Sequence, residues 1–400
     1  MRAIRLAVLW AAFLAMAALC ACQLLLPFQE AGPATDGGNP ESQVDAAPDA
    51  EADADARAAD ADAAAKSDAA ADADAAADSG ADTCAPGTCQ PIPLAGNQTS
   101  PTCIRLYAGD VYWSTNSGAS TSGIWHVPAD GGGMPRTLAT AFYVAGLTVG
   151  PNGVYWTDPS GVETLIDGGP SNFVGGTNAQ MVTADDASVY WSDWGTNKPI
   201  YAEPFGMPAA SPPTPIYPTN AGTAFGLVVS GGTLYWTTND TNPMDGLVVS
   251  GSVAGGQATT MATGQANPLG VAVDTTAVYW ANSGTQGADA GSVDQSVWML
   301  TFSGNPTPLA QNLSHPVAVW SDPSTSYVYW VELGSPPLYA DGRVVRASKT
   351  PPANPTVLAT GQGAPSDITG DDTWIYWANA GAVLPDGGTA ANGQIMKLPK

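Results

Sequence analysis

The chain has few of the side chains on which most enzymes rely. Its 400 residues include two histidines, His126 and His315, five cysteines, and 12 lysines and arginines against 36 acidic residues. Two histidines cannot build a multi-histidine metal centre, and no Gly-x-Ser-x-Gly elbow or phosphate-cradling glycine loop occurs. The net charge of −24 argues against nucleic acid or anionic membrane surfaces as partners. We expect no catalytic constellation and no cofactor, and we expect both histidines to be surface or packing residues.

Aromatic side chains are also few, at 8% of the chain, and many of them recur in one pattern. The tripeptide Val-Tyr-Trp, or a close variant, occurs seven times, with its tyrosine at Tyr112, Tyr155, Tyr190, Tyr235, Tyr279, Tyr329 and Tyr376. Successive tyrosines lie 35 to 50 residues apart. A repeat of this period is typical of a stacked or radial array.

Each repeat contains four short apolar strands separated by Gly, Pro, Asn and Asp. Around Tyr279 we expect strands at 269–273, at the tripeptide, at 292–300 and at 306–310. Their period-two polarity indicates an antiparallel meander, and four such strands in about 45 residues form one blade of a β-propeller. Side chains alternate along a strand, so Val and Trp should face one neighbouring blade and Tyr the other. We interpret these aromatics as packing between blades, not as ligand contacts.

Closure of the ring decides the number of blades. The last repeat stops after its third strand, 393–398, whereas residues 90–98 read like the fourth strands of other repeats. We infer that 92–95 completes the last blade and removes the open sheet edges. The sequence therefore predicts an all-β, seven-bladed propeller over 84–400, with six or eight blades as less favoured readings.

The N-terminus indicates export. Arg2 and Arg5 precede an apolar run that is too short to favour a stable membrane span. The run ends in Leu19-Cys20-Ala21-Cys22, which resembles the lipobox of bacterial lipoproteins. The resemblance implies a signal peptide at 1–21 and an acylated Cys22, palmitate being one expected chain. With Gln23 next, it implies an outer-membrane lipoprotein on the cell surface or the periplasmic face. Simple secretion is the alternative.

Residues 22–83 are expected to form a disordered tether. From Glu30 to Asp82 the chain holds 15 acidic residues against Arg57 and Lys66, and it lacks aromatics. Such a segment cannot bury a core. Its Asp-Ala alternation faintly suggests calcium binding, but the glycine turn and closing glutamate of a calcium loop are missing.

The repeats resemble the YWTD repeats of low-density-lipoprotein-receptor-type propellers. Tyr155-Trp156-Thr157-Asp158 matches that motif fully and Tyr190-Trp191-Ser192-Asp193 nearly so, while other repeats carry Asn282, Glu332 or Asn379 at the last position. The chain also resembles bacterial lipoproteins of unassigned role, through Val127-Pro128 and Leu358-Ala359-Thr360-Gly361-Gln362. The resemblance covers 90–400 and implies a fold, because propellers host many activities.

Three cysteines, Cys84, Cys89 and Cys103, lie at the junction between tether and propeller. In an oxidising compartment two of them can pair and one thiol is left over. We favour a disulfide between Cys84 and Cys89, although the sequence does not settle the pairing.

The predicted ring carries longer loops on one face than on the other, and this difference points to a function. The connections between second and third strands are long and emerge on one face of the ring, and insertions gathered on one face of a repeat protein usually mark its binding surface. These connections and their flanks carry the candidate binding residues Asp158, Asp193, Trp194, Asp240, Asp245, Asp289, Glu332, Tyr339, Asp341 and Asp386. For Asp158, Asp193 and Glu332 the alternative is hydrogen bonding to an adjacent blade or turn, and for the whole set it is a solvated, variable surface.

The favoured function is a monomeric, membrane-anchored binding module for an envelope protein or a glycan. The alternatives are an envelope enzyme that uses carboxylates, such as a polysaccharide lyase or hydrolase, and a structural spacer. A fixed carboxylate pair near the central channel would favour the enzyme.

Overall fold

The computed structural model describes residues 89–116, 122–166, 169–175, 177–194, 199–206, 213–218, 223–239, 245–286, 292–382 and 392–400. These residues form strands and turns, with no helix among them. The predicted signal peptide, Cys22, the predicted tether, Cys84 and three candidate binding residues (Asp240, Asp289 and Asp386) lie outside this description.

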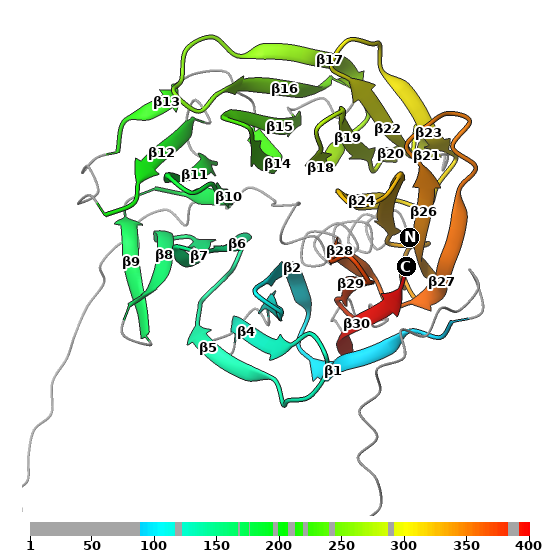
Figure 1. The fold of residues 1–400 in the computed structure, drawn as a ribbon, viewed down its shortest axis with the longest axis horizontal. Helices are drawn as coiled ribbons and strands as arrows, with labels where there is room; N and C mark the ends of the chain where they lie inside the picture. The colour runs from blue at the N-terminus through cyan, green and yellow to red at the C-terminus, as the bar shows by residue number, and fades with distance from the viewer. Residues whose placement is uncertain are drawn as a thin grey trace, which may run out of the picture. The chain divides into compact units, whose positions relative to one another are not determined.

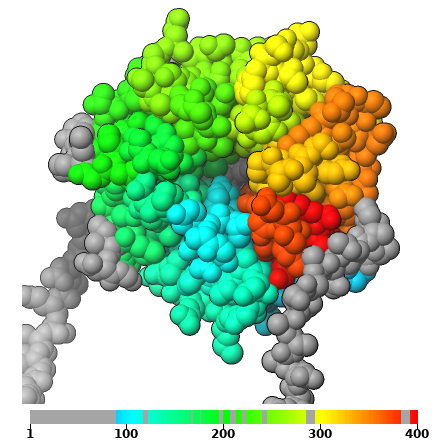
Figure 2. Space-filling view, viewed as in Figure 1, coloured from blue at the N-terminus to red at the C-terminus, as the bar shows by residue number. Residues whose placement is uncertain are grey.

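Seven four-stranded antiparallel sheets surround a central hollow (Figures 1 and 2). Blade 1 is β2 (Pro101–Tyr107), β3 (Asp110–Thr115), β4 (Gly123–Pro128) and β5 (Arg136–Thr140). Blade 2 is β6 (Gly146–Gly150), β7 (Gly153–Asp158), β8 (Gly161–Ile166) and β9 (Gly169–Gly175). Blade 3 is β10 (Ala179–Ala184), β11 (Ser188–Asp193), β12 (Ile200–Pro204) and β13 (Pro215–Tyr217). Blade 4 is β14 (Thr223–Ser230), β15 (Thr233–Asn239), β16 (Gly246–Ser252) and β17 (Thr259–Gln265).

Blade 5 is β18 (Pro268–Val273), β19 (Ala277–Asn282), β22 (Ser296–Thr301) and β23 (Thr307–Gln311). Blade 6 is β24 (Pro316–Ser321), β25 (Tyr327–Glu332), β26 (Gly342–Ser348) and β27 (Thr356–Gln362). Blade 7 is β28 (Pro365–Gly370), β29 (Trp374–Asn379), β30 (Gly393–Pro399) and β1 (Ile92–Gln98). The third strand expected at 292–300 is divided: β21 (Ser292–Val293) pairs with β20 (Thr285–Gln286) in a separate ribbon.

The ring closes as the sequence predicts. Strand β1 pairs antiparallel with β30, from Ile92 opposite Lys397 to Gln98 opposite Gly393, and so supplies the fourth strand of blade 7. Strands from the two ends of the propeller therefore share one sheet (Figure 1). The prediction of seven blades is confirmed.

The core consists of seven clusters, one at each contact between blades. Tyr376 of blade 7 packs in one cluster with Val111 and Trp113 of blade 1. Each other seam repeats this combination of a tyrosine with the tripeptide of the next blade. All seven tripeptide tryptophans are less than 2% exposed. The predicted division of Val and Trp to one face and Tyr to the other is thus confirmed.

A glutamine at the end of the fourth strand secures three of these seams. Gln98 Oε1 accepts a hydrogen bond from Trp113 Nε1 of the next blade at 3.0 Å. Gln265 does the same for Trp280 at 2.8 Å, and Gln362 for Trp377 at 3.0 Å. This contact explains the Leu-Ala-Thr-Gly-Gln pattern, since its last residue satisfies a buried indole N–H in the neighbouring blade.

Two adjacent seams lack this glutamine. Phe142 stands at the equivalent position between blades 1 and 2, and Thr177 between blades 2 and 3. Among the described residues, the indole nitrogens of Trp156 and Trp191 then have no hydrogen-bond partner, and neither has the Thr177 hydroxyl. Phe142 is 65% exposed. These two seams therefore lack the indole hydrogen bond that the glutamines supply elsewhere.

Cys89 and Cys103 are each disulfide-bonded. Cys103 is fully buried on the first strand of blade 1. Because Cys84 lies outside the described residues, its pairing with Cys89 stays a prediction.

Replacing Gln362 with alanine removes an acceptor shared by two buried donors, Trp377 Nε1 and Asn379 Nδ2. We expect Gln362→Ala to lower the free energy of unfolding by about 1–3 kcal/mol, the usual cost of an unsatisfied buried polar group. Urea denaturation followed by tryptophan fluorescence measures this. The control Gln311→Ala changes an exposed glutamine on the fourth strand of blade 5 and should shift stability by less than about 0.5 kcal/mol. Equal losses of stability in the two variants would contradict the role assigned to Gln362.

The reverse change should stabilise the seam between blades 1 and 2. Phe142→Gln places an acceptor where Trp156 Nε1 has none, so we expect a gain of about 0.5–1.5 kcal/mol in the same assay. Phe142→Ala removes the exposed ring without supplying an acceptor. No gain by the glutamine variant over the alanine variant would show that the indole is not reached.

Candidate functional site

The two ends of the ring differ. We call the end that carries the second-to-third connections the long-loop face; these include residues 283–295, 333–341 and 380–392. The opposite end, the short-turn face, carries the first-to-second turns, such as 108–109 and 231–232. The second-to-third connections range from two residues (159–160) to 13 (380–392), whereas the first-to-second turns have two to five. The short-turn face also carries the third-to-fourth connections, of which 205–214 is the longest.

Glu332, on the long-loop side of blade 6, is 1% exposed. Its Oε1 accepts a hydrogen bond from Trp330 Nε1 at 3.0 Å, and its Oε2 accepts one from Ser314 N at 3.0 Å and pairs with Arg343. Glu332 thus satisfies the indole N–H of Trp330 from the same strand, where in three other seams a glutamine of the preceding blade does so.

Asp158 and Asp193 occupy the equivalent place in blades 2 and 3. Asp158, 8% exposed, accepts hydrogen bonds from the backbone N, at 2.8 Å, and the hydroxyl of Ser160. Asp193, 7% exposed, accepts one from Asn178 N at 3.3 Å. The structure places both carboxylates, like Glu332, in hydrogen bonds to turns and connections of the fold.

The other described candidates differ in exposure. Trp194 lies edge-on to Phe225 with ring centroids 6.2 Å apart and is partly buried. Tyr339 is 2% exposed and lies edge-on to His315. Asp341 is exposed, and hydrogen bonds from Ser335, chiefly its backbone N–H, lower the pKa of the carboxyl. Asp245 is exposed on the connection before β16.

Both histidines take packing roles, as expected. His126 stacks on Tyr112 with centroids 5.7 Å apart. His315 is buried beside Tyr339, and burial lowers the pKa of its imidazole.

The central channel contains a charged pair that sequence reasoning missed. A cavity of about 290 Å³ is lined by the first strands of all seven blades. Arg105 of β2 and Asp367 of β28 meet there, with Arg105 Nη1 2.7 Å from Asp367 Oδ2. They are the only charged residues on these seven strands. That isolation within apolar and hydroxyl-bearing strands is the sequence signal that identifies them.

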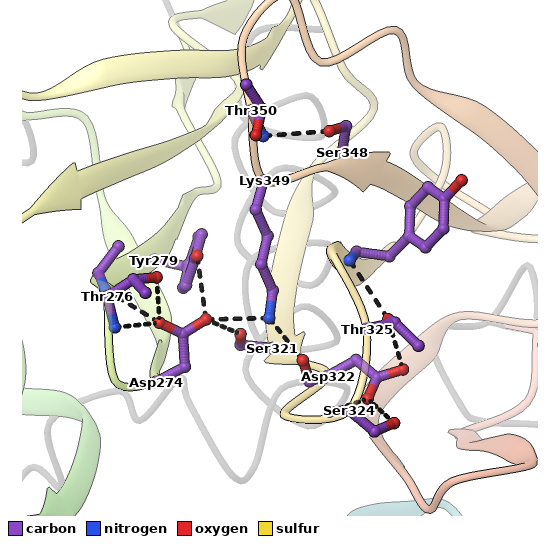
Figure 3. A network of polar contacts seen from close by, with 12 residues as sticks. Asp274, Thr276, Tyr279, Ser321, Asp322, Ser324, Thr325, Ser348, Lys349 and Thr350 are labelled. Atoms are coloured by element: carbon purple, nitrogen blue, oxygen red, sulfur yellow. Dashed lines mark hydrogen bonds and ion pairs between the residues drawn. The ribbon is translucent and has the colours of Figure 1, made fainter.

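A second polar network lies at the short-turn face between blades 5 and 6 (Figure 3). Asp274 Oδ2 accepts hydrogen bonds from Tyr279 at 3.1 Å and Ser321 at 2.8 Å, and lies 2.9 Å from Lys349 Nζ. Lys349 also donates to the carbonyl of Asp322, whose carboxylate pairs with Lys400. Burial alone would raise the pKa of Asp274, but hydrogen bonds from Thr276, Lys349 and Ser321 together lower it well below its usual range.

This lowered pKa predicts a pH dependence. A carboxylate whose pKa falls on folding contributes stability above its unfolded pKa, and that contribution is lost as pH drops towards the folded value. We expect Asp274→Asn to be less stable than the parent at pH 7, with the gap narrowing below about pH 4. Urea midpoints between pH 7 and pH 3 measure the gap. Asp186→Asn, an exposed acid on another short turn, serves as the control, and a gap that stays constant with pH would contradict the assignment.

No helix in the described ranges is long and apolar enough to span a membrane. The same ranges contain no group of three or more His, Cys, Asp or Glu side chains placed to hold a metal ion.

No family model and no curated protein sequence matches the chain. Solved structures do match. Hydrazine synthase of Kuenenia stuttgartiensis is 13% identical over 76% of this chain and 96% of its own, with a TM-score of 0.59. A puromycin-hydrolysing peptidase of Mycobacterium tuberculosis is 14% identical over 79% of this chain and 55% of its own, with a TM-score of 0.53. A nidogen/laminin complex is 19% identical over 68% of this chain and 86% of its own, with a TM-score of 0.43. At such identities the likeness shows the fold alone: the chain is a seven-bladed β-propeller.

Proposed function

We propose that the protein is a membrane-anchored, extracytoplasmic binding module that recognises a protein or a glycan through its long-loop face. The observation that carries this proposal is the difference between the two faces. The first-to-second turns at one end have two to five residues, and aspartates such as Asp274 and Asp371 hold them by hydrogen bonds, whereas the second-to-third connections at the other end reach 13 residues at 283–295 and 380–392. A rigid scaffold that presents variable loops at one end is the usual arrangement of a binding surface.

Strand direction supports the anchored arrangement. Ile92 at the start of β1 pairs with Lys397, close to the short-turn face, where Lys400 N donates to Thr373 O of the turn between β28 and β29. The chain before β1 therefore meets the propeller at the short-turn face. A lipid on Cys22 would therefore be joined to the propeller through the short-turn face, at the end opposite the proposed binding loops.

The channel supports a binder more than a carboxylate enzyme. Among its described lining residues the acidic one is Asp367, and that carboxylate is paired with Arg105. Glycosidases use two carboxyl groups on either side of the reacting bond. The channel instead presents one carboxylate that is already neutralised.

Capture of envelope material tests the proposal. The full-length protein is immobilised and exposed to solubilised envelope proteins and glycans of its own cell, and bound material is identified by mass spectrometry and glycan analysis. A loop variant carries Asp240→Asn, Asp245→Asn and Asp289→Asn. We expect selective capture by the parent and at least a tenfold loss in the loop variant, because acidic loop residues supply the specific contacts.

A matched variant controls for charge. Asp130, Asp186 and Asp372 are exposed acids at the short-turn face, and their replacement by asparagine changes the net charge equally. This variant should capture as the parent does. Loss in both variants would indicate non-specific electrostatics, and capture that neither variant changes would place the binding surface elsewhere.

A further inference from the structure

The central channel is a built cavity, separate from the long-loop face. Its lining residues include Thr183, Val273, Ser321 and Thr369, which lie towards the short-turn ends of their strands. Nearer the long-loop ends of blades 4 to 6, Phe225, Leu269 and Val317 are buried in one hydrophobic cluster. The space-filling view shows the hollow at the centre of the ring (Figure 2). The cavity therefore belongs to the short-turn half of the channel.

The wall of the cavity is rich in hydrogen-bonding groups. Each lining strand is the edge strand of its blade, so the backbone groups along its inner edge make no ladder hydrogen bonds in the described sheets. Thr148, Thr183 and Thr369 add hydroxyl groups. Such a wall offers donors and acceptors side by side, which suits a ligand that can both give and receive hydrogen bonds.

Arg105 supplies the strongest donor. Its Nη1 donates to the carbonyl of Ile104 at 2.6 Å and to Asp367 Oδ2 at 2.7 Å. Its Nε and Nη2 donate to no group of the described residues, and the side chain is 32% exposed within the cavity. The pair fixes the guanidinium, so its remaining N–H groups are oriented before a ligand arrives.

The carboxylate of Asp367, by contrast, has little capacity left to accept further hydrogen bonds. Its Oδ2 accepts from Ile104 N at 3.0 Å as well as from Arg105, and its Oδ1 accepts from Ile368 N at 2.9 Å. A cationic ligand would therefore find a carboxylate that is 10% exposed and already bonded. An anionic ligand would meet an arginine that Asp367 neutralises, inside a protein of net charge −24.

The volume of the cavity limits the size of the ligand. A volume of about 290 Å³ lies at the lower limit of small-molecule sites, which span roughly 300–1,000 Å³. The cavity accommodates a molecule of monosaccharide size.

We propose that the short-turn half of the channel binds a small, neutral, hydroxyl-rich molecule of monosaccharide size, held by the free N–H groups of Arg105 and the threonine hydroxyls. This site is independent of the long-loop face.

Titration calorimetry of the full-length protein tests the proposal. The probes are D-glucose, D-galactose and N-acetyl-D-glucosamine, with D-glucuronate and inorganic phosphate as anionic comparators. We expect saturable binding of at least one neutral sugar at a 1:1 ratio and weaker or no binding of both anions. Arg105→Lys keeps the charge beside Asp367 but loses the planar fork, so it should weaken sugar binding about tenfold or more.

Two further variants keep the test decisive. Arg346→Lys makes the same change over the Tyr327 ring on the short-turn side of blade 6, outside the cavity lining, and should bind the sugar as the parent does. Thr148→Val removes one lining hydroxyl without altering the ion pair, and should weaken binding several-fold even if Arg105→Lys does not fold. Failure of every neutral probe to bind, tighter binding of an anion, or unchanged affinity in folded Arg105→Lys and Thr148→Val would overturn the proposal.

Discussion

The tyrosine of each blade packs against the tryptophan and the Val, Leu or Ile of the next blade's tripeptide, and the rest of the structure depends on this contact. A four-stranded blade has two broad faces, and neither can be buried within the blade itself. Only a neighbour on each side covers both, and only a closed ring gives every blade two neighbours. The seven seams between blades are therefore the hydrophobic core. Each buried aromatic removes roughly 150–250 Å² from water, which explains why the tripeptide is retained while the loops vary.

The polar residues around this core serve the same seams. Gln98, Gln265 and Gln362 accept from indole nitrogens, and Glu332 takes over that task in blade 6. Acidic residues two positions after the tryptophan therefore resemble a repeated functional set in the sequence, yet they complete hydrogen bonds of the scaffold. Exposed groups such as Asp245 and Asp341 remain to distinguish the long-loop face.

The repeats contain enough information to predict the scaffold, but not the channel. The spacing of the tripeptide and its period-two polarity predict the seven blades and the alternation of Val, Trp and Tyr. They also predict a closing strand at 92–95, which the structure extends to Gln98. Arg105 and Asp367 are 262 residues apart, and ring closure alone makes them neighbours. The burial of Tyr339 cannot be predicted either, because the path of the loop between β25 and β26 follows no period. For Glu332, by contrast, hydrogen bonding to the fold is one of the two readings that the sequence offers. The division of the third strand of blade 5 also follows no repeat. There the connection after β19 pairs with itself, as β20 with β21, before β22 begins.

Closure by β1 has a mechanical consequence. A force applied to the chain before Ile92 acts on the end of β1 nearest the short-turn face, while a counterforce on the long-loop face acts at the opposite end of the ring. The resulting force runs along β1, parallel to its axis and across the ladder it makes with β30. Hydrogen bonds loaded in this direction share the load and must break together, whereas a force across the strand would open them one at a time. The strand that completes the ring is thus oriented to carry tension applied along the chain that precedes it.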